Sequence, residues 1–118
     1  MGGSASSAFF AGTASPNSPR VLLNAHIDPG SGEINAQFDG TLQTASGLLG
    51  SNWTITFAGH AWTAITVDAA GSGVTIVATQ AGATADPDRL SYTAASPDLR
   101  DAAGLLVGPQ TPVVLYEL

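Results

Sequence analysis

The sequence predicts an all-β protein, a single antiparallel β-sandwich of about seven strands with an extended N-terminal arm. Three observations predict this fold class. Short runs in which apolar and polar residues alternate recur along the chain, and turn-forming residues separate them about every 8–12 positions. No long window has the periodicity of a helix, and 118 residues suffice for one domain but not for two ordinary ones.

The first 20 residues differ in composition from the rest, so we expect an arm at 1–20 and the sandwich at 21–118. The arm consists mainly of Gly, Ser, Ala and Thr, with one apolar pair, Phe9 and Phe10. Such a segment cannot build a core of its own. Two aromatic rings can bury a large apolar area, so Phe9 and Phe10 are the expected anchors on a partner. The alternative is that the arm returns onto its own sheet.

Residues 21–27 alternate with period two and predict a strand with one core face. The turn-rich residues 28–32 follow, and residues 34–38 alternate again. Two strands joined by a short Gly-rich turn predict a hairpin. Residues 40–52 are open between a helical turn and a loop, because their glycines disfavour a long helix.

Residues 53–57 alternate and predict the third strand. A turn is expected at 58–60, after which the β-branched run 62–68 forms the fourth strand. The small residues 69–73 interrupt the pattern. Residues 74–79 have the strongest strand composition of the whole chain.

A loop of small residues at 80–88 separates this strand from the next, at 90–93. Residues 94–112 are expected to be a loop with one helical turn near 98–103. Residues 113–118 form the last strand and are apolar on both faces. Because one face serves the core, the other is expected to pair or pack with another chain, with Val114 and Tyr116 as partner-binding residues.

Composition excludes several classes of function. Only 10% of the residues are charged, the three basic residues are all Arg, and the formal net charge is −6. Nucleic-acid binding depends on neutralising phosphates, so we expect no such partner. The absence of Cys excludes a disulfide framework and a cysteine nucleophile. No apolar run approaches the roughly 18 residues of a membrane span, and the N-terminus does not resemble a signal peptide. We therefore expect no membrane partner.

Residues for catalysis are scarce, and we expect no enzyme and no cofactor. The histidines, His26 and His60, are not obviously placed beside each other, and no Gly-x-Ser-x-Gly motif occurs. We expect no metal, although four carboxylates at the two ends of the strand at 90–93 are weak candidates for calcium. These carboxylates are Asp86, Asp88, Asp98 and Asp101. The alternative is that they cap the backbone of turns.

Three aromatic residues, Trp53, Trp62 and Tyr92, are candidates for contact with a sugar. Trp53 is in phase with Ile55 and Phe57, so we expect it in the core. Trp62 is less constrained and is the possible ligand aromatic. Asn52 begins an N-glycosylation pattern, which carries little weight without a signal sequence.

Residues 90–104 resemble the end of bacterial Ig-like repeats of the SwmB type. The matching residues are Leu90-Ser91-Tyr92-Thr93, then Pro97, then Asp101-Ala102-Ala103-Gly104. The strand after Pro19 and the run 38–42 are also similar, so the likeness covers about residues 20–118, whereas Leu105 stands where the family usually has Asn. The resemblance implies an Ig-like β-sandwich without catalytic residues. Similar single modules occur in the heads, tails and fibres of bacteriophages.

We therefore expect a non-enzymatic structural protein of a virus particle, either a phage capsid decoration or a tail-associated subunit. It would dock through its N-terminal arm and sheet edges. Its expected partners are major capsid or tail subunits and further copies of itself, and its expected location is the virion, after synthesis in the host cytoplasm without a signal peptide. The alternative is a cell-surface adhesion or carbohydrate-binding Ig-like module. That alternative predicts an exposed aromatic pair on one sheet face or a calcium loop.

Overall fold

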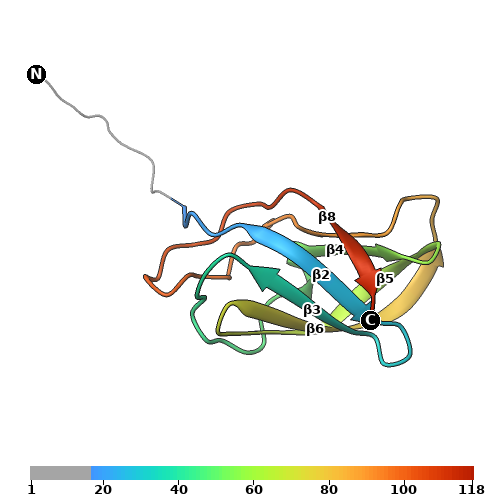
Figure 1. Ribbon diagram of the computed structural model, residues 1–118, viewed down its shortest axis with the longest axis horizontal. Helices are drawn as coiled ribbons and strands as arrows, with labels where there is room; N and C mark the ends of the chain where they lie inside the picture. The colour runs from blue at the N-terminus through green and yellow to red at the C-terminus, as the bar shows by residue number, and fades with distance from the viewer. Residues whose placement is uncertain (1–16) are drawn as a thin grey trace, which may run out of the picture.

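The computed structural model describes residues 17–118, and within this part the all-β class is confirmed (Figure 1). One turn of 3-10 helix, Gly50–Asn52, precedes the third strand. The strands are β2 (Leu22–Asp28), β3 (Glu33–Phe38), β4 (Trp53–Phe57), β5 (His60–Ala70), β6 (Gly73–Ala83), β7 (Arg89–Tyr92) and β8 (Val113–Glu117).

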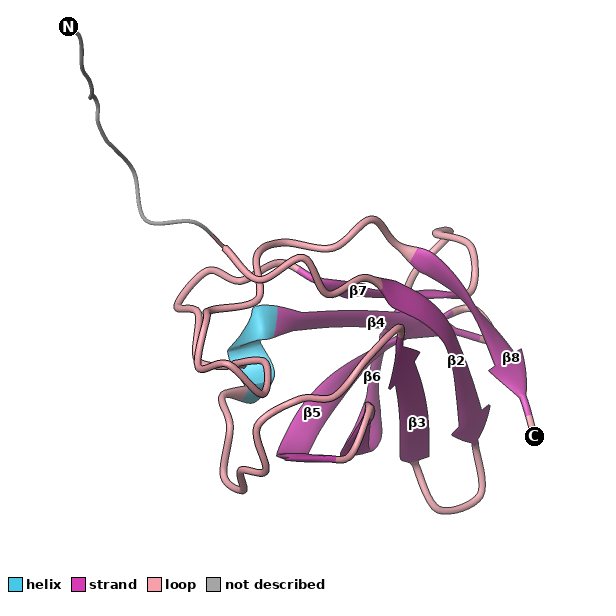
Figure 2. Ribbon diagram, turned by 60° about the vertical axis from the view of Figure 1, so that its left-hand side comes forward, coloured by secondary structure: helices cyan, strands magenta, loops and turns pink. Residues whose placement is uncertain are grey.

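The strands form one closed barrel in the order β2-β3-β6-β5-β4-β7-β8 (Figure 2). Closure comes from β8, which lies parallel to β2 with Leu115 opposite Ala25, while all other neighbouring strands are antiparallel. We expected an antiparallel sandwich with free sheet edges, and the closed barrel corrects that expectation. Alternation within a strand shows which face is buried, but it does not show which strand lies alongside, so ring closure was missed.

The core fills the barrel with the inward residues of each strand. In β3, Ile34, Ala36 and Phe38 are buried while the residues between them are exposed. The Trp53 and Tyr92 rings lie with their centroids 4.8 Å apart, and both side chains are buried. The expectation that Trp53 belongs to the core is therefore confirmed.

Strands β5 and β6 are longer than predicted. Their added residues are mostly small or polar, so the sequence pattern did not indicate a strand there. Residues 80–83 were expected to be part of a loop, yet β6 continues to Ala83, which pairs with His60. The central part of 40–52 also pairs with β5, through Ala45 and Ala69. Backbone pairing with a neighbouring strand stabilises the extended conformation here, although the local composition does not favour it.

No helical turn occurs at 98–103. Arg100 instead pairs with Leu106, and Asp101 pairs with Leu42. The chain before β2 is also part of the folded unit, because Ser18 is buried and pairs in parallel with Val107. Of the expected arm, residues 17–20 thus lie against the barrel.

Candidate functional site

Five apolar side chains that are at least half exposed lie along two paired strands and the residues flanking them. We call these residues the β2–β8 seam: Val21, Leu23, Val114, Tyr116 and Leu118. Their exposure has a local cause. In β8 the side chain of Leu115 points into the core, which directs its two neighbours outward. In β2 a bulge between Leu22 and Asn24 breaks the alternation and leaves Leu23 exposed.

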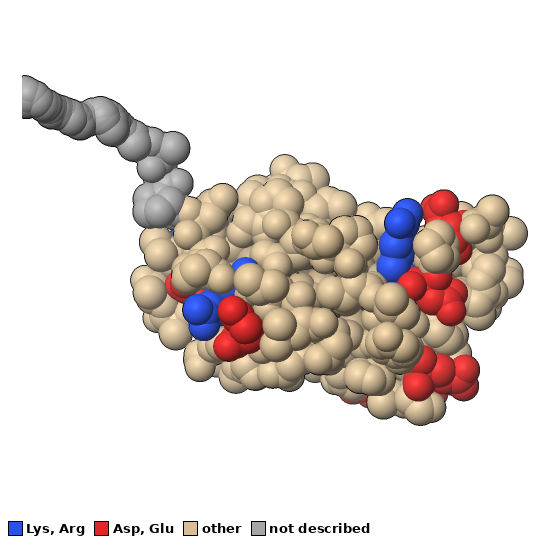
Figure 3. Space-filling view, turned by 45° about the horizontal axis from the view of Figure 1, so that its top comes forward, with Lys and Arg blue, Asp and Glu red and all other residues tan. Residues whose placement is uncertain are grey.

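Charged side chains leave much of this side of the barrel free. Figure 3 shows them in clusters toward the two ends of the face in view, with an uncharged surface between. At the end where the chain enters the barrel, Arg20 Nε lies 3.5 Å from Asp39 Oδ1. Asp28 and Glu33 lie at the other end, in the β2–β3 hairpin. A surface with few charges can be buried against a partner at little desolvation cost.

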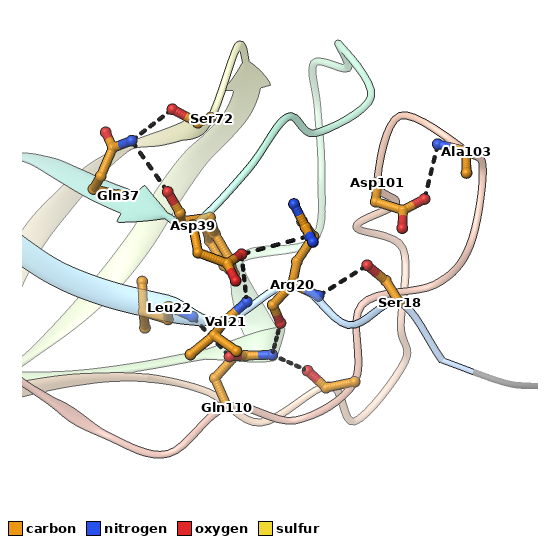
Figure 4. Close-up of polar contacts among 12 residues, drawn as sticks. Ser18, Arg20, Val21, Leu22, Gln37, Asp39, Ser72, Asp101, Ala103 and Gln110 are labelled. Atoms are coloured by element: carbon orange, nitrogen blue, oxygen red, sulfur yellow. Dashed lines mark hydrogen bonds and ion pairs between the residues drawn. The ribbon is translucent and has the colours of Figure 1, made fainter.

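The entry of the chain into β2 is held by a polar network (Figure 4). The Gln110 side chain accepts a hydrogen bond from the Leu22 amide at 2.8 Å and donates one to the Arg20 carbonyl at 3.1 Å. Asp39 accepts from the Val21 amide at 2.9 Å. The start of the described chain is therefore fixed beside Val21, at one end of the seam. The anchors Phe9 and Phe10 lie outside the described residues.

Asp101 is a structural residue of this same end. Its carboxylate accepts hydrogen bonds from the backbone amides of Ala103 and Leu105, at 3.0 and 2.9 Å. The Ser18 hydroxyl is the main cause that lowers the pKa of Asp101, and burial opposes it. Asp101 thus caps a turn, which was the alternative to calcium binding.

Two of the other calcium candidates accept hydrogen bonds at separate places in the fold. Asp98 accepts from the Leu49 amide at 2.6 Å and from the Asn52 side chain at 3.1 Å. Asp88 accepts from the Ala58 amide at 2.9 Å, and Asp86 is exposed. Within residues 17–118, no three His, Asp or Glu side chains lie together in an arrangement that could hold a metal. The structure therefore does not bring the four candidates into one site.

Trp62, the possible ligand aromatic, is only partly exposed. Its side chain packs partly buried against the core, and its Nε1 donates to the Phe57 carbonyl at 3.1 Å. The glycosylation pattern is also not usable in the folded protein, because Asn52 is 0% exposed. Trp62 as a ligand residue stays a prediction, since part of its side chain remains exposed.

Sequence reasoning missed a hollow of about 310 Å³ on the outer face of β2, β3, β6 and β5. One row across these strands contains His26, Asn35, Thr75 and Asp68, each opposite the next. The sequence indicates part of this row, because the predicted β2–β3 hairpin already places His26 opposite Asn35. The rest of the row depends on the β3–β6 register, which joins segments distant in sequence.

In the part of the chain that the structure describes, no helix is long and apolar enough to cross a membrane. Comparison with protein-family models, with curated proteins and with solved structures found no match.

Proposed function

We propose that the protein is a non-enzymatic structural subunit of a virus particle, which docks on neighbouring subunits through the β2–β8 seam and the residues before Asn17. The observation that carries the docking role is the seam itself. Its five apolar side chains range from 50% to 72% exposed on a chain with few charges. Exposed apolar side chains gathered along one pair of strands are typical of interaction sites.

The strand order supports the Ig-like resemblance on which the virion role depends. An Ig domain places strands A, B, E and D in one sheet and C, F and G in the other. Named in sequence order, β2, β3, β6 and β5 correspond to A, B, E and D, and β4, β7 and β8 to C, F and G. Trp53 at the start of β4 packs on Tyr92 of β7, as a buried Trp on strand C packs between the sheets of an Ig domain.

The closed barrel changes how docking works. Strand β8 is already paired with β2 on one edge and with β7 on the other. The expectation that a partner strand adds to β8 is therefore wrong. Contact through the seam is instead made by side chains. Phe9 is eight residues before Asn17 and can lie at most about 29 Å from it, so Phe9 and Phe10 can contact the same neighbour as the seam.

Self-association tests the docking role. Light scattering over a range of concentrations would compare the full chain with a Leu23→Ser/Val114→Ser variant and with a chain lacking residues 1–16. We expect the full chain to form oligomers and both altered chains to be mainly monomeric. Ile65→Ser is the matched control, because Ile65 is 59% exposed but lies on β5. A monomeric full chain, or an equal effect of the control, would contradict the proposal.

The virion location needs its own test. An antibody raised against the purified chain would be applied to particles isolated from the organism that carries the sequence. Labelling of the particle surface or tail is expected. Label found only in the particle-free fraction would contradict a structural role in the virion, while leaving the seam as a docking surface of another assembly.

A further inference from the structure

We propose that the hollow on the outer face of β2, β3, β6 and β5 is a binding site for a neutral sugar. This inference is independent of the docking role. The hollow measures about 310 Å³, at the lower end of the range of about 300–1,000 Å³ found for small-ligand pockets. It therefore has room for one or two sugar rings rather than for a folded partner.

Small residues create the hollow. Gln37, Gly73 and Ala70 lie opposite one another in a row across β3, β6 and β5. Gly73 has no side chain and Ala70 has only a methyl group, so the surface is depressed at this point. In the next row, Asn35 and Thr75 have longer, polar side chains and form a wall of the hollow.

The wall residues supply both donors and acceptors of hydrogen bonds. The amides of Asn24 and Asn35 and the hydroxyl of Thr75 line the hollow. Two further groups are held in place by the fold. Gln37 donates through Nε2 to Ser72 Oγ and to the Phe38 carbonyl, and Asp68 accepts from the Gly47 amide at 3.1 Å. Groups fixed before binding lose little entropy when a ligand arrives.

The chemistry of the lining favours a polyol over charged ligands. No Lys or Arg lines the hollow, so nothing there would balance a phosphate or carboxylate. Asp68 is its single carboxylate, and it does not belong to a group of three possible metal ligands among the described residues. Sugar hydroxyls both donate and accept, which matches amide, hydroxyl and imidazole groups. The His26 ring also lines the hollow, and its centroid lies 5.8 Å from that of the Tyr116 ring.

Nuclear magnetic resonance tests this site directly. The ¹⁵N-labelled chain would be titrated with the methyl glycosides of glucose, galactose, mannose and N-acetylglucosamine. The side-chain NH₂ signals of Asn24, Asn35 and Gln37 report on the hollow without any substitution. We expect at least one sugar to shift these signals with a dissociation constant in the millimolar range, as befits a shallow site. No shift with any of the four sugars, or shifts spread evenly over the barrel, would overturn the proposal.

A filled hollow provides the matched variant. A Cβ added at Gly73 would meet its nearest atom, the Ala36 carbonyl oxygen, at 3.5 Å, which is ordinary contact. Gly73→Thr should therefore fold and occupy the space needed by the sugar. Gly82→Thr is the control on the same strand, since nothing lies within 4 Å of a Cβ there.

We expect Gly73→Thr to lower the affinity at least tenfold and Gly82→Thr to leave it unchanged. Asn35→Ala, an exposed position whose change should not disturb folding, is expected to weaken binding several-fold and serves if Gly73→Thr does not fold. Unaltered binding by a folded Gly73→Thr chain, or by Asn35→Ala, would overturn the assignment.

Discussion

Asn52 offers the sharpest test of how the long connections are held to the barrel. Its Nδ2 donates to the Ser96 carbonyl at 2.9 Å and to Asp98 Oδ1 at 3.1 Å, while its Oδ1 accepts from the Ser96 amide at 2.8 Å. Asn52→Ala removes all three bonds. A neutral hydrogen bond contributes about 1 kcal/mol and one to a charged group about 1.5–3 kcal/mol. Because Ser96 is exposed and water can replace its lost partners, we expect a net loss of about 3 kcal/mol.

Thermal and urea unfolding, followed by circular dichroism, would measure this loss. For about 100 folded residues, 3 kcal/mol corresponds to a fall in the unfolding midpoint of about 12 °C. The matched control is Thr54→Ala, two residues away and exposed on β4, with an expected change within about 0.5 kcal/mol. A loss below about 1 kcal/mol for Asn52→Ala would refute the reasoning, since the three bonds would then contribute almost nothing.

Three further results are expected. Gly32→Ala should destabilise the protein by more than about 2 kcal/mol in urea unfolding, because Gly32 has φ +77° and an added Cβ would collide with the Ala78 carbonyl. Asp101 has a lowered pKa in the folded state, so its contribution to stability is present at neutral pH and is lost as the pH falls below about 3.9. Asp101→Asn should therefore show a weaker loss of stability in acid than the native chain. Burial raises the pKa of Tyr92, so stability should fall as the pH rises above about 10, and unfolding of Tyr92→Phe should lack that fall.

The strands and their buried faces were predictable from the sequence because each is a local pattern. In β3, alternation alone assigns Ile34 and Phe38 to the core and Asn35 to the surface. The same pattern predicts Leu115 inside β8 with Val114 and Tyr116 outside, which the exposures confirm. Burial with period two needs no knowledge of the neighbouring strand.

Pairing between distant strands was not predictable in this way. Ala25 lies opposite Leu115 across the closing pair, although 90 residues separate them. The hollow has the same origin, because Asn35 faces Thr75 only once β3 and β6 are aligned. The partial burial of Trp62 was not predictable for a related reason. Its indole nitrogen is satisfied by the Phe57 carbonyl across a tight turn, which residue type alone does not show.

Strand β2 carries residues of both proposed surfaces, and its bulge is what places them on the same face. Leu23 sits at the bulge and belongs to the seam, whereas Asn24 and His26 line the hollow. Without the extra residue, period two would place Leu23 on the opposite face from both. The bulge thus brings one apolar residue of the seam and two polar residues of the hollow to the outer face of one short strand. The two surfaces meet where the His26 and Tyr116 rings lie 5.8 Å apart, so side-chain substitutions away from this pair should alter one surface without the other.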